Sequence, residues 1–130
     1  MSIAVRYYSR SGNTKALAEA IAHAVGTQAV SVDAANAKFD TPVDVLFVGG
    51  ALYAYGIDGH LKEYLKTLKA SDAQKAVVFS TSWVSKHAID LIKRGLSEAG
   101  IPVADDVLYV RGKPNDAQLA DAAAFAKRFV

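Results

Sequence analysis

The sequence IAVRYYSRSGNT, residues 3–14, joins a β-rich run to a polar turn that leads directly into a helix. Residues 3–8 predict a strand, and the helical pattern that follows the turn reaches about Val25. Gly26 can close this helix as a left-handed cap. The apolar positions of the helix fall on one stripe, at Leu17, Ile21, Ala24 and Val25. A strand, a turn and a helix in this order begin a βαβ unit.

The rest of the chain repeats this alternation of short apolar runs and helical periods. Four more strands are expected, at residues 28–32, 44–48, 75–79 and 102–110. Gly49 and Gly50 are expected to end the third strand, and Asp105 and Asp106 to break the last. The pattern predicts an α/β fold: a three-layer, doubly wound sandwich around a five-stranded parallel sheet, in a single domain over residues 1–130.

Three more helices are expected between and after these strands. Asp58 can cap a helix that runs to about Leu68, a second helix covers residues 87–99, and Pro114 can start the last one. The last helix should bury Leu119, Ala122, Ala126 and Phe129. Residues 33–42 leave room for one helical turn at most, which is near the lower limit for a crossover between parallel strands.

The composition is that of a folded protein with a mild positive charge. Hydrophobic residues make up 52% of the chain and charged residues 22%, which excludes a disordered tail. The chain has no cysteine, and no spacing of His, Asp or Glu suggests a metal site. The net charge of +2 comes without a basic run interleaved with aromatic residues, so nucleic acid is not an expected partner.

The sequence also lacks the pattern of a membrane span or a signal peptide. Its longest uncharged stretch, residues 45–57, is shorter than the about 20 apolar residues that a span requires. The N-terminal residues look like a strand and have no basic start followed by an apolar core. We therefore expect a cytoplasmic protein without a membrane partner, and a monomer.

The turn SRSGNT has the features of an anion-binding loop. Gly12 permits a positive φ and a close approach of the backbone, and the following helix directs its free N–H groups into the loop. Three hydroxyl groups suit one terminal phosphate. The candidate phosphate-binding residues are Ser9, Arg10, Ser11, Gly12, Asn13 and Thr14.

Other phosphate-binding patterns do not fit the chain. The P-loop and the dinucleotide pattern G-x-G-x-x-G are absent. A phospho-acceptor domain of this topology would need carboxylates at the ends of strands one and three. Those positions hold Tyr7, Tyr8, Gly49 and Gly50 instead.

The loop resembles the phosphate loop of flavodoxins, which reads [ST]-x-[ST]-G-x-T. Ser9, Ser11, Gly12 and Thr14 match its four specified positions. The resemblance continues in GGALYAYGIDGHLKEYL, residues 49–65, and in FSTSWVSKHAIDLIKRGLSEAGIPVADD, residues 79–106. It implies strand order 2-1-3-4-5, bound FMN and electron transfer, and the length matches the short-chain form.

The resemblance also implies that two further segments, both expected to be loops after the third and fourth strands, hold the flavin ring. Ligands of such folds bind beyond the carboxyl ends of the strands. Flat side chains suit the ring faces, and these segments offer Tyr53, Tyr55 and Trp83. Thr81 and Ser82 could donate to the phosphate or the ribityl chain. The candidate residues are Ala51, Leu52, Tyr53, Ala54, Tyr55 and Gly56 after the third strand, and Thr81, Ser82, Trp83 and Val84 after the fourth.

The resemblance gives Gly56 a specific role. Flavodoxins flip a backbone peptide in this segment when flavin N5 gains a proton on reduction, and glycine makes such a flip inexpensive. We assign the flip to residues 55–57. The alternative is an ordinary turn glycine.

The remaining polar residues suggest no catalytic side chain. His23, His60 and His87 are expected at the surface, with a position at a flavin edge as the alternative for His60 and His87. Lys62, Lys66 and Lys69 are expected on one solvated helix face. Three functions stay open: a flavodoxin-like carrier that passes electrons between redox partner proteins, a reductase and an acceptor; an FMN-dependent NAD(P)H oxidoreductase of the quinone-reductase type; and a flavin-free binding module. Since the chain is slightly basic where electron-carrying flavodoxins are acidic, its partner need not be a basic reductase.

Overall fold

The computed structural model describes residues 1–53, 56–83 and 85–130. Its middle layer is a sheet of five parallel strands in the order β2-β1-β3-β5-β6. A short additional strand, β4 (Gly56–Ile57), pairs antiparallel with the end of β3. The parallel strands are β1 (Ile3–Tyr7), β2 (Ala29–Ser31), β3 (Val43–Tyr53), β5 (Ala73–Ser82) and β6 (Leu108–Arg111). The expected order 2-1-3-4-5 is confirmed, because the expected fourth and fifth strands are β5 and β6.

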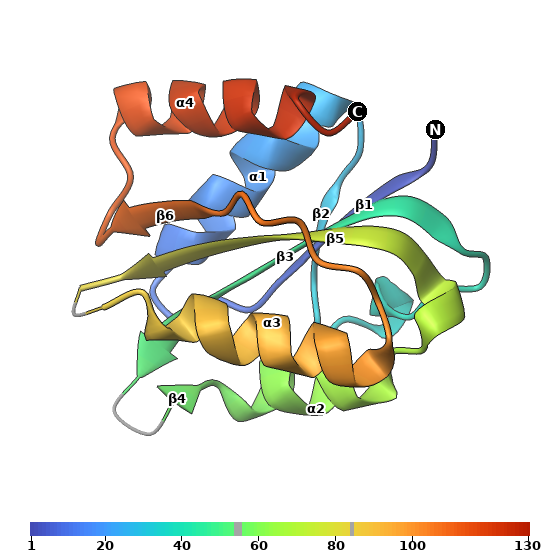
Figure 1. Cartoon of the computed structure of the whole chain (residues 1–130). Coiled ribbons are helices and arrows are strands. Elements are labelled where there is room, and N and C mark those ends of the chain that lie inside the picture. The colour runs from blue at the N-terminus through green and yellow to red at the C-terminus, as the bar shows by residue number, and fades with distance from the viewer. Residues whose placement is uncertain (54–55, 84) are drawn as a thin grey trace.

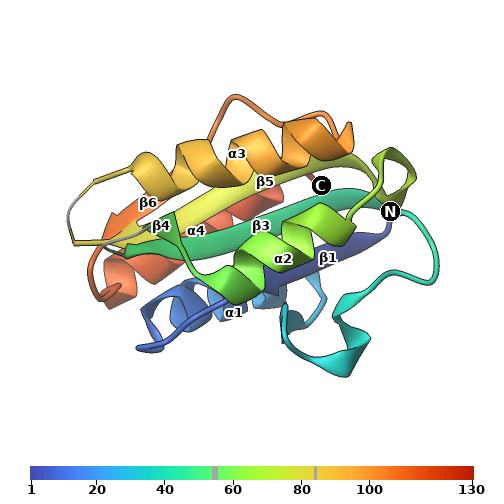
Figure 2. The same ribbon diagram turned by 90° about the horizontal axis from the view of Figure 1, so that it is seen from below.

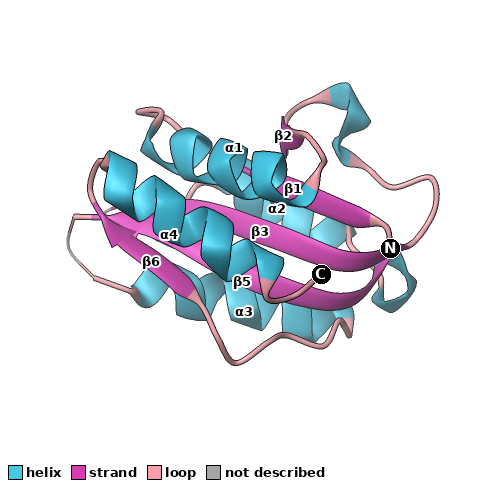
Figure 3. Ribbon diagram, turned by 90° about the horizontal axis from the view of Figure 1, so that it is seen from above, coloured by secondary structure: helices cyan, strands magenta, loops and turns pink. Residues whose placement is uncertain are grey.

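Helices cover both faces of this sheet. On one face lie α1 (Asn13–Val25) and α4 (Asp116–Lys127), which are in front in Figure 3. On the other lie α2 (Gly59–Thr67) and α3 (His87–Ala99), which are in front in Figure 2. Figure 1 shows the three layers edge-on. The predicted three-layer sandwich is confirmed.

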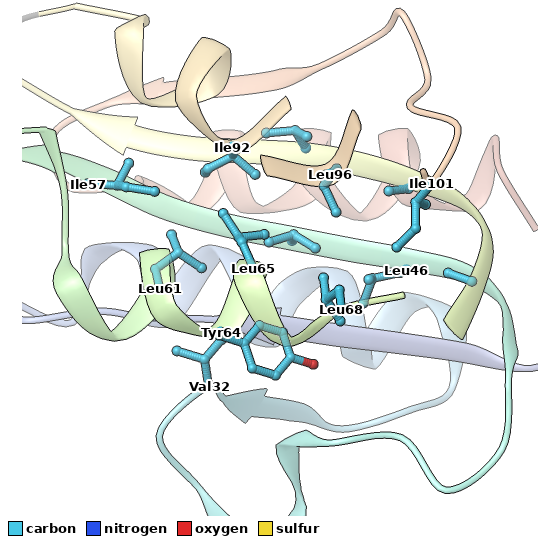
Figure 4. Close-up of a cluster of buried hydrophobic side chains, with 14 of the residues drawn as sticks. Val32, Leu46, Ile57, Leu61, Tyr64, Leu65, Leu68, Ile92, Leu96 and Ile101 are labelled. Atoms are coloured by element: carbon cyan, nitrogen blue, oxygen red, sulfur yellow. The ribbon is translucent and has the colours of Figure 1, made fainter. Parts of the chain in front are cut away.

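The sheet separates two apolar cores. Leu17, Ile21 and Phe79 belong to the core under α1 and α4. The second core, between the sheet and α2 and α3, contains Leu61, Leu65 and Ile92 (Figure 4). Both cores pack along the sheet. This packing holds the ends of the strands in place, and loops that follow the strands are positioned by this rigid edge.

Gly49 and Gly50 do not end the third strand, contrary to the expectation. β3 continues to Tyr53, and Gly50 and Ala51 pair with Ser80 and Thr81 of β5. The two glycines make room for buried neighbours instead. A Cβ at Gly49 would lie 2.0 Å from Cε2 of Phe79, and one at Gly50 would lie 2.4 Å from Cδ2 of Leu61.

The segments expected to be loops after the third and fourth strands are therefore partly strand. Leu52 and Tyr53 pair with Ile57 and Gly56 in a hairpin, and β5 runs on to Ser82. Hydrogen bonds between neighbouring strands therefore hold the backbone at this edge of the sheet. The composition of these segments does not predict this pairing.

The crossover at residues 33–42 contains the single short turn that was expected, η1 (Ala35–Ala37). Arg6 is buried and attaches it to the sheet: its Nε donates to the carbonyl oxygen of Ala37 at 2.8 Å. The hydroxyl of Tyr64 donates to the same oxygen at 2.8 Å. A second short turn, η2 (Ala70–Asp72), leads into β5.

The C-terminal part confirms the broken strand and corrects one helix start. Val103 forms an isolated bridge with Ala76, and pairing resumes only at β6. The last helix is capped by Asn115 rather than started by Pro114, because the Asn115 side chain accepts from the N–H of Gln118 at 2.8 Å. The fully buried stripe of α4 is Ala122, Phe125 and Ala126; Leu119 and Phe129 are half-buried.

Candidate functional site

The carboxyl ends of β1, β3 and β5 bring the three predicted segments to one edge of the sheet. Tyr7 pairs with Gly49, and Gly49 with Phe79, so β1 ends beside β3, and β3 and β5 continue together past it to Tyr53 and Ser82. The hydroxyls of Thr14 and Thr81 are 2.6 Å apart and buried, which joins the start of α1 to the end of β5. These ends lie at the left of Figure 1. The segments can therefore contact a single ligand.

The loop at residues 9–14 has the backbone geometry of an anion-binding turn. Gly12 has φ +93°, in the left-handed region, and immediately precedes α1. Its N–H donates to Oγ of Ser9 at 3.0 Å. No side chain of an N-cap residue caps α1 or α3, whereas Asp58 caps α2 and Asn115 caps α4; of the two uncapped helices, only α1 follows a left-handed glycine. A Cβ built on Gly12 meets no atom within 4 Å, so the space beside this turn is open.

Arg10 lies in this loop, but its side chain contacts Asp58 and Tyr53, which lie outside the loop. Its Nε is 2.8 Å and its Nη2 is 2.6 Å from the same carboxylate oxygen, Oδ2 of Asp58. Its guanidinium carbon is 3.9 Å from the centre of the Tyr53 ring, close enough for a cation–π interaction. Arg10 thus connects the loop at residues 9–14 to the end of β3 through Tyr53, and to the start of α2 through Asp58.

Asp58 is the residue that sequence reasoning recognised only as a helix cap. Its side chain is 7% exposed. The second carboxylate oxygen, Oδ1, accepts from the backbone N–H of His60 at 2.8 Å and lies 2.8 Å from Nδ1 of the same residue. The His60 ring in turn stacks on Tyr8, with ring centres 4.7 Å apart. The only signal for this network in the sequence is the closeness of Asp58 and His60.

The environment of Asp58 favours its ionised form. Burial alone would raise the pKa of this carboxyl, but the hydrogen bonds from His60 and Arg10, together with the Arg10 charge, outweigh burial and hold its pKa below the ordinary value. The carboxylate therefore remains charged at neutral pH and contributes an ion pair and a helix cap to the folded state.

This pKa predicts how acid affects stability. A carboxyl with a lowered pKa stabilises the folded state above its unfolded pKa, and this contribution is lost as the pH falls through the folded pKa. We expect Asp58→Asn to reduce the free energy of unfolding by about 1 kcal/mol at pH 7. The difference between the variant and the parent should shrink below about pH 4. Urea unfolding at a series of pH values measures it, and a difference that is independent of pH would contradict the prediction.

The remaining ring-segment residues lie at the same edge. Ala51, Leu52 and Tyr53 are half-buried in β3, and Gly56 has φ +119° in β4. Thr81 and Ser82 are buried at the end of β5. Ala54, Tyr55 and Val84 lie outside the described residues, so the proposed flip at residues 55–57 and the contacts of these three residues stay predictions.

Trp83 follows β5 and has 65% of its surface exposed. It packs against Gly112, where a Cβ would lie 2.4 Å from the indole ring. Sequence reasoning missed Gly112 and also Tyr109, whose hydroxyl donates to the carbonyl oxygen of Ser82 at 2.9 Å. Both come from the last strand and the turn after it, which carry no distinctive motif.

The described part of the chain contains neither a cluster of metal ligands nor a membrane-spanning helix. No group of three or more His, Cys, Asp or Glu side chains there could hold a metal ion. No helix among those residues combines the length and the apolar character needed to cross a membrane.

Comparison with known proteins agrees with this architecture. A family model described as "Flavodoxin domain" matches residues 4–121. The Nostoc sp. protein "Putative diflavin flavoprotein A 5" is 34% identical over 134 residues, which cover 92% of this chain and 23% of the relative. The chain thus spans about a quarter of the length of this curated relative.

Solved structures give the same result over the whole chain. A flavodoxin from the domain Archaea superposes with a TM-score of 0.78 at 27% identity, covering 99% of this chain and 96% of the other. Oxidised flavodoxin 1 from Bacillus cereus superposes with a TM-score of 0.83 at 20% identity, covering 99% and 97%. At 20% identity, the match to the Bacillus cereus flavodoxin supports the fold alone.

Proposed function

The chain belongs to the flavodoxin domain family, and from this membership we propose that it binds FMN and transfers electrons between redox partner proteins. Its relatives include flavodoxins and the flavodoxin-like domains of diflavin flavoproteins. The proposed cofactor site comprises the loop at residues 9–14 and the segments at residues 51–56 and 81–84. We further propose that the protein acts in the cytoplasm as a monomeric oxidoreductase component.

One observation supports the proposal most strongly: α1 begins without a side-chain cap behind a left-handed glycine. The first N–H groups of a helix need partners, and the positive end of the helix dipole favours an anion. Ser9 and Ser11 belong to the same loop, and a Cβ built on Gly12 meets no atom within 4 Å. A terminal phosphate placed there would accept from these backbone and hydroxyl donors. Thr14 would act indirectly, because its hydroxyl is bonded to Thr81.

The ring would lie between the other two segments. Tyr53 and Trp83 would contribute flat apolar surface, together with Tyr55 from outside the described residues. With 65% of its surface exposed, the Trp83 side chain is accessible to a ligand that lies against this segment. Backbone groups of residues 51–56 and 81–84 would contact the polar ring edge.

Bound FMN would supply the redox chemistry, since it accepts and releases one or two electrons. The chain would bind the phosphate, exclude water from one ring face and present the other to a partner. No side chain needs to act as an acid or a base in such a transfer. We therefore assign no catalytic residue.

Gly56→Ala is expected to lower the midpoint potential for the first electron. A backbone flip next to flavin N5 would become more costly, because alanine adopts both signs of φ less readily than glycine. A cost of about 1 kcal/mol corresponds to a shift of about 40–50 mV for one electron. A redox titration measures it, and an unchanged first potential would remove the flip from the account.

The charge near the ring segment predicts the kind of partner. Three cations, Lys62, Lys66 and Arg94, and one acidic residue, Glu98, line a groove between α2 and α3 that also includes Gly56. These cations favour an acidic partner. Oxidation of the reduced protein by hexacyanoferrate(III), an anion, should therefore slow as ionic strength rises. The triple variant Lys62→Glu/Lys66→Glu/Arg94→Glu should reverse the trend, and a rate that salt leaves unchanged in the parent would contradict the prediction.

Stepwise reduction followed by the visible spectrum tests the carrier function. A carrier is expected to accumulate a long-wavelength one-electron state. Direct passage to the two-electron state, with oxidation of NADPH by the pure protein, would favour an NAD(P)H oxidoreductase. A protein that takes up no flavin would be a binding module on the same fold.

A further inference from the structure

We propose that Arg10 and Asp58 form a clamp that holds the ring-binding segment to the phosphate loop, so that Arg10 positions the flavin ring and is not a phosphate ligand. This inference rests on the proposed FMN site and refines it. It differs from the expectation drawn from the sequence, which placed Arg10 among the phosphate-binding residues.

The first argument is the direction of the Arg10 side chain. Two nitrogens on one edge of its guanidinium, Nε and Nη2, lie 2.8 and 2.6 Å from Oδ2 of Asp58. An arginine that binds phosphate in a bidentate manner uses such an edge. In this protein Asp58, which is 48 residues away in sequence, occupies it.

The second argument is the contact with Tyr53. The guanidinium carbon lies 3.9 Å from the centre of the Tyr53 ring, so the planar cation covers one side of this residue. Tyr53 pairs with Gly56 in the β3–β4 hairpin. Fixing Tyr53 therefore also restrains Gly56, and the two residues belong to the proposed ring site.

The third argument is the state of Asp58. Arg10 contacts one of its carboxylate oxygens and His60 the other. Such a buried carboxylate is costly to leave without its cation. If Arg10 turned to the phosphate, Asp58 would lose that cation and would lie near a group with a charge of about −2. The arrangement with Arg10 on Asp58 avoids this repulsion.

The fourth argument is that the clamp is attached to two elements, the helix α2 and the strand β1. Asp58 caps α2. The ring of His60, on the same carboxylate, stacks on Tyr8 directly after β1. Arg10 follows Tyr8 by two residues, so the network forms a closed circuit from β1 to α2 and back. A ligand-independent circuit of this kind preorganises the site.

The test uses the double variant Arg10→Gln/Asp58→Asn with two ligands, FMN and riboflavin. Removing both charges leaves the net local charge unchanged, so long-range attraction of the phosphate is preserved. If Arg10 and Asp58 form a clamp, both dissociation constants should rise by about tenfold, as expected for one lost charge-assisted contact. Titration of flavin fluorescence measures both constants.

The matched control is Ser11→Ala, an exposed residue of the same loop outside the network. It should weaken FMN and leave riboflavin unchanged. A loss confined to FMN in the double variant, or no loss with either ligand, would overturn the clamp. Binding of neither flavin by the unchanged protein would instead refute the proposed function.

A measurement on the ligand-free protein separates the two failures completely. Hydrogen exchange should be faster in the double variant at Tyr53 and Ile57, and unchanged in the centre of β3 at Phe47. Equal exchange at Tyr53 and Ile57 in the variant and the parent would overturn the clamp whether or not flavin binds.

Discussion

Gly12→Val is expected to weaken FMN binding by about 100-fold, or about 2.7 kcal/mol. Gly12 has φ +93°, a conformation that a β-branched residue disfavours strongly. The variant can relieve this strain only by turning the backbone, which would misalign N–H donors at the start of α1. The added side chain would also enter the open space in which we place the phosphate. Calorimetry with FMN measures the loss.

Gly26→Val is the matched control for this experiment. Gly26 lies at the other end of α1, has φ +77°, and likewise has no atom within 4 Å of a built Cβ. Both variants should lose about 1–2 kcal/mol of stability through backbone strain. Only the Gly12 variant should lose FMN affinity. Equal affinity in the two variants would show that the loop at residues 9–14 does not bind the phosphate.

Gly49→Ala is expected to reduce the free energy of unfolding by about 3 kcal/mol, a large effect for one added methyl group. Its Cβ would lie 2.0 to 2.4 Å from three atoms of the Phe79 ring, which is fully buried in the core under α1 and α4. Gly49 pairs with Tyr7 on one side and with Phe79 on the other, so β3 has little freedom to move away. Urea unfolding measures the loss.

Two further variants identify the cause of that loss. Gly59→Ala, where a Cβ meets no atom within 4 Å, should be neutral or slightly stabilising at the start of α2. Phe79→Ala alone should cost about 3–5 kcal/mol. The double variant Gly49→Ala/Phe79→Ala should cost less than the sum, because the cavity accepts the new methyl group. Additive losses would mean that steric conflict with Phe79 is not the reason.

The fold was predictable from the sequence because each element carries a local signal. Hydrophobic periodicity predicted α3 at residues 87–99, the bounds that the structure has. Gly26 and Gly100 end their helices at positive φ, as left-handed caps. The strand order followed from the resemblance to flavodoxins, and the structure agrees.

Two errors concern residues whose role depends on the side chain of another residue. Gly49 and Gly50 were expected to end the third strand. Their actual role is to leave room for the side chains of Phe79 and Leu61, which approach them only in the folded chain. Pro114 looked like a helix start, although the side chain of Asn115 is the cap. In both cases a side-chain interaction, and not the local sequence rule, determined the structure.

The candidate site divides in the same way. The motif at residues 9–14 could be recognised locally, since an anion-binding turn is built from adjacent residues. The Arg10–Asp58–His60 network could not, because it joins residues far apart in sequence through side-chain directions. Tyr109 and Gly112 were missed for the same reason.

Calorimetric titration of the flavin-free protein with FMN tests the central proposal most directly. The account predicts heat release with a stoichiometry of one nucleotide per chain, and a native mass spectrum that contains the same adduct. No heat in the titration and no flavin in the mass spectrum would contradict it.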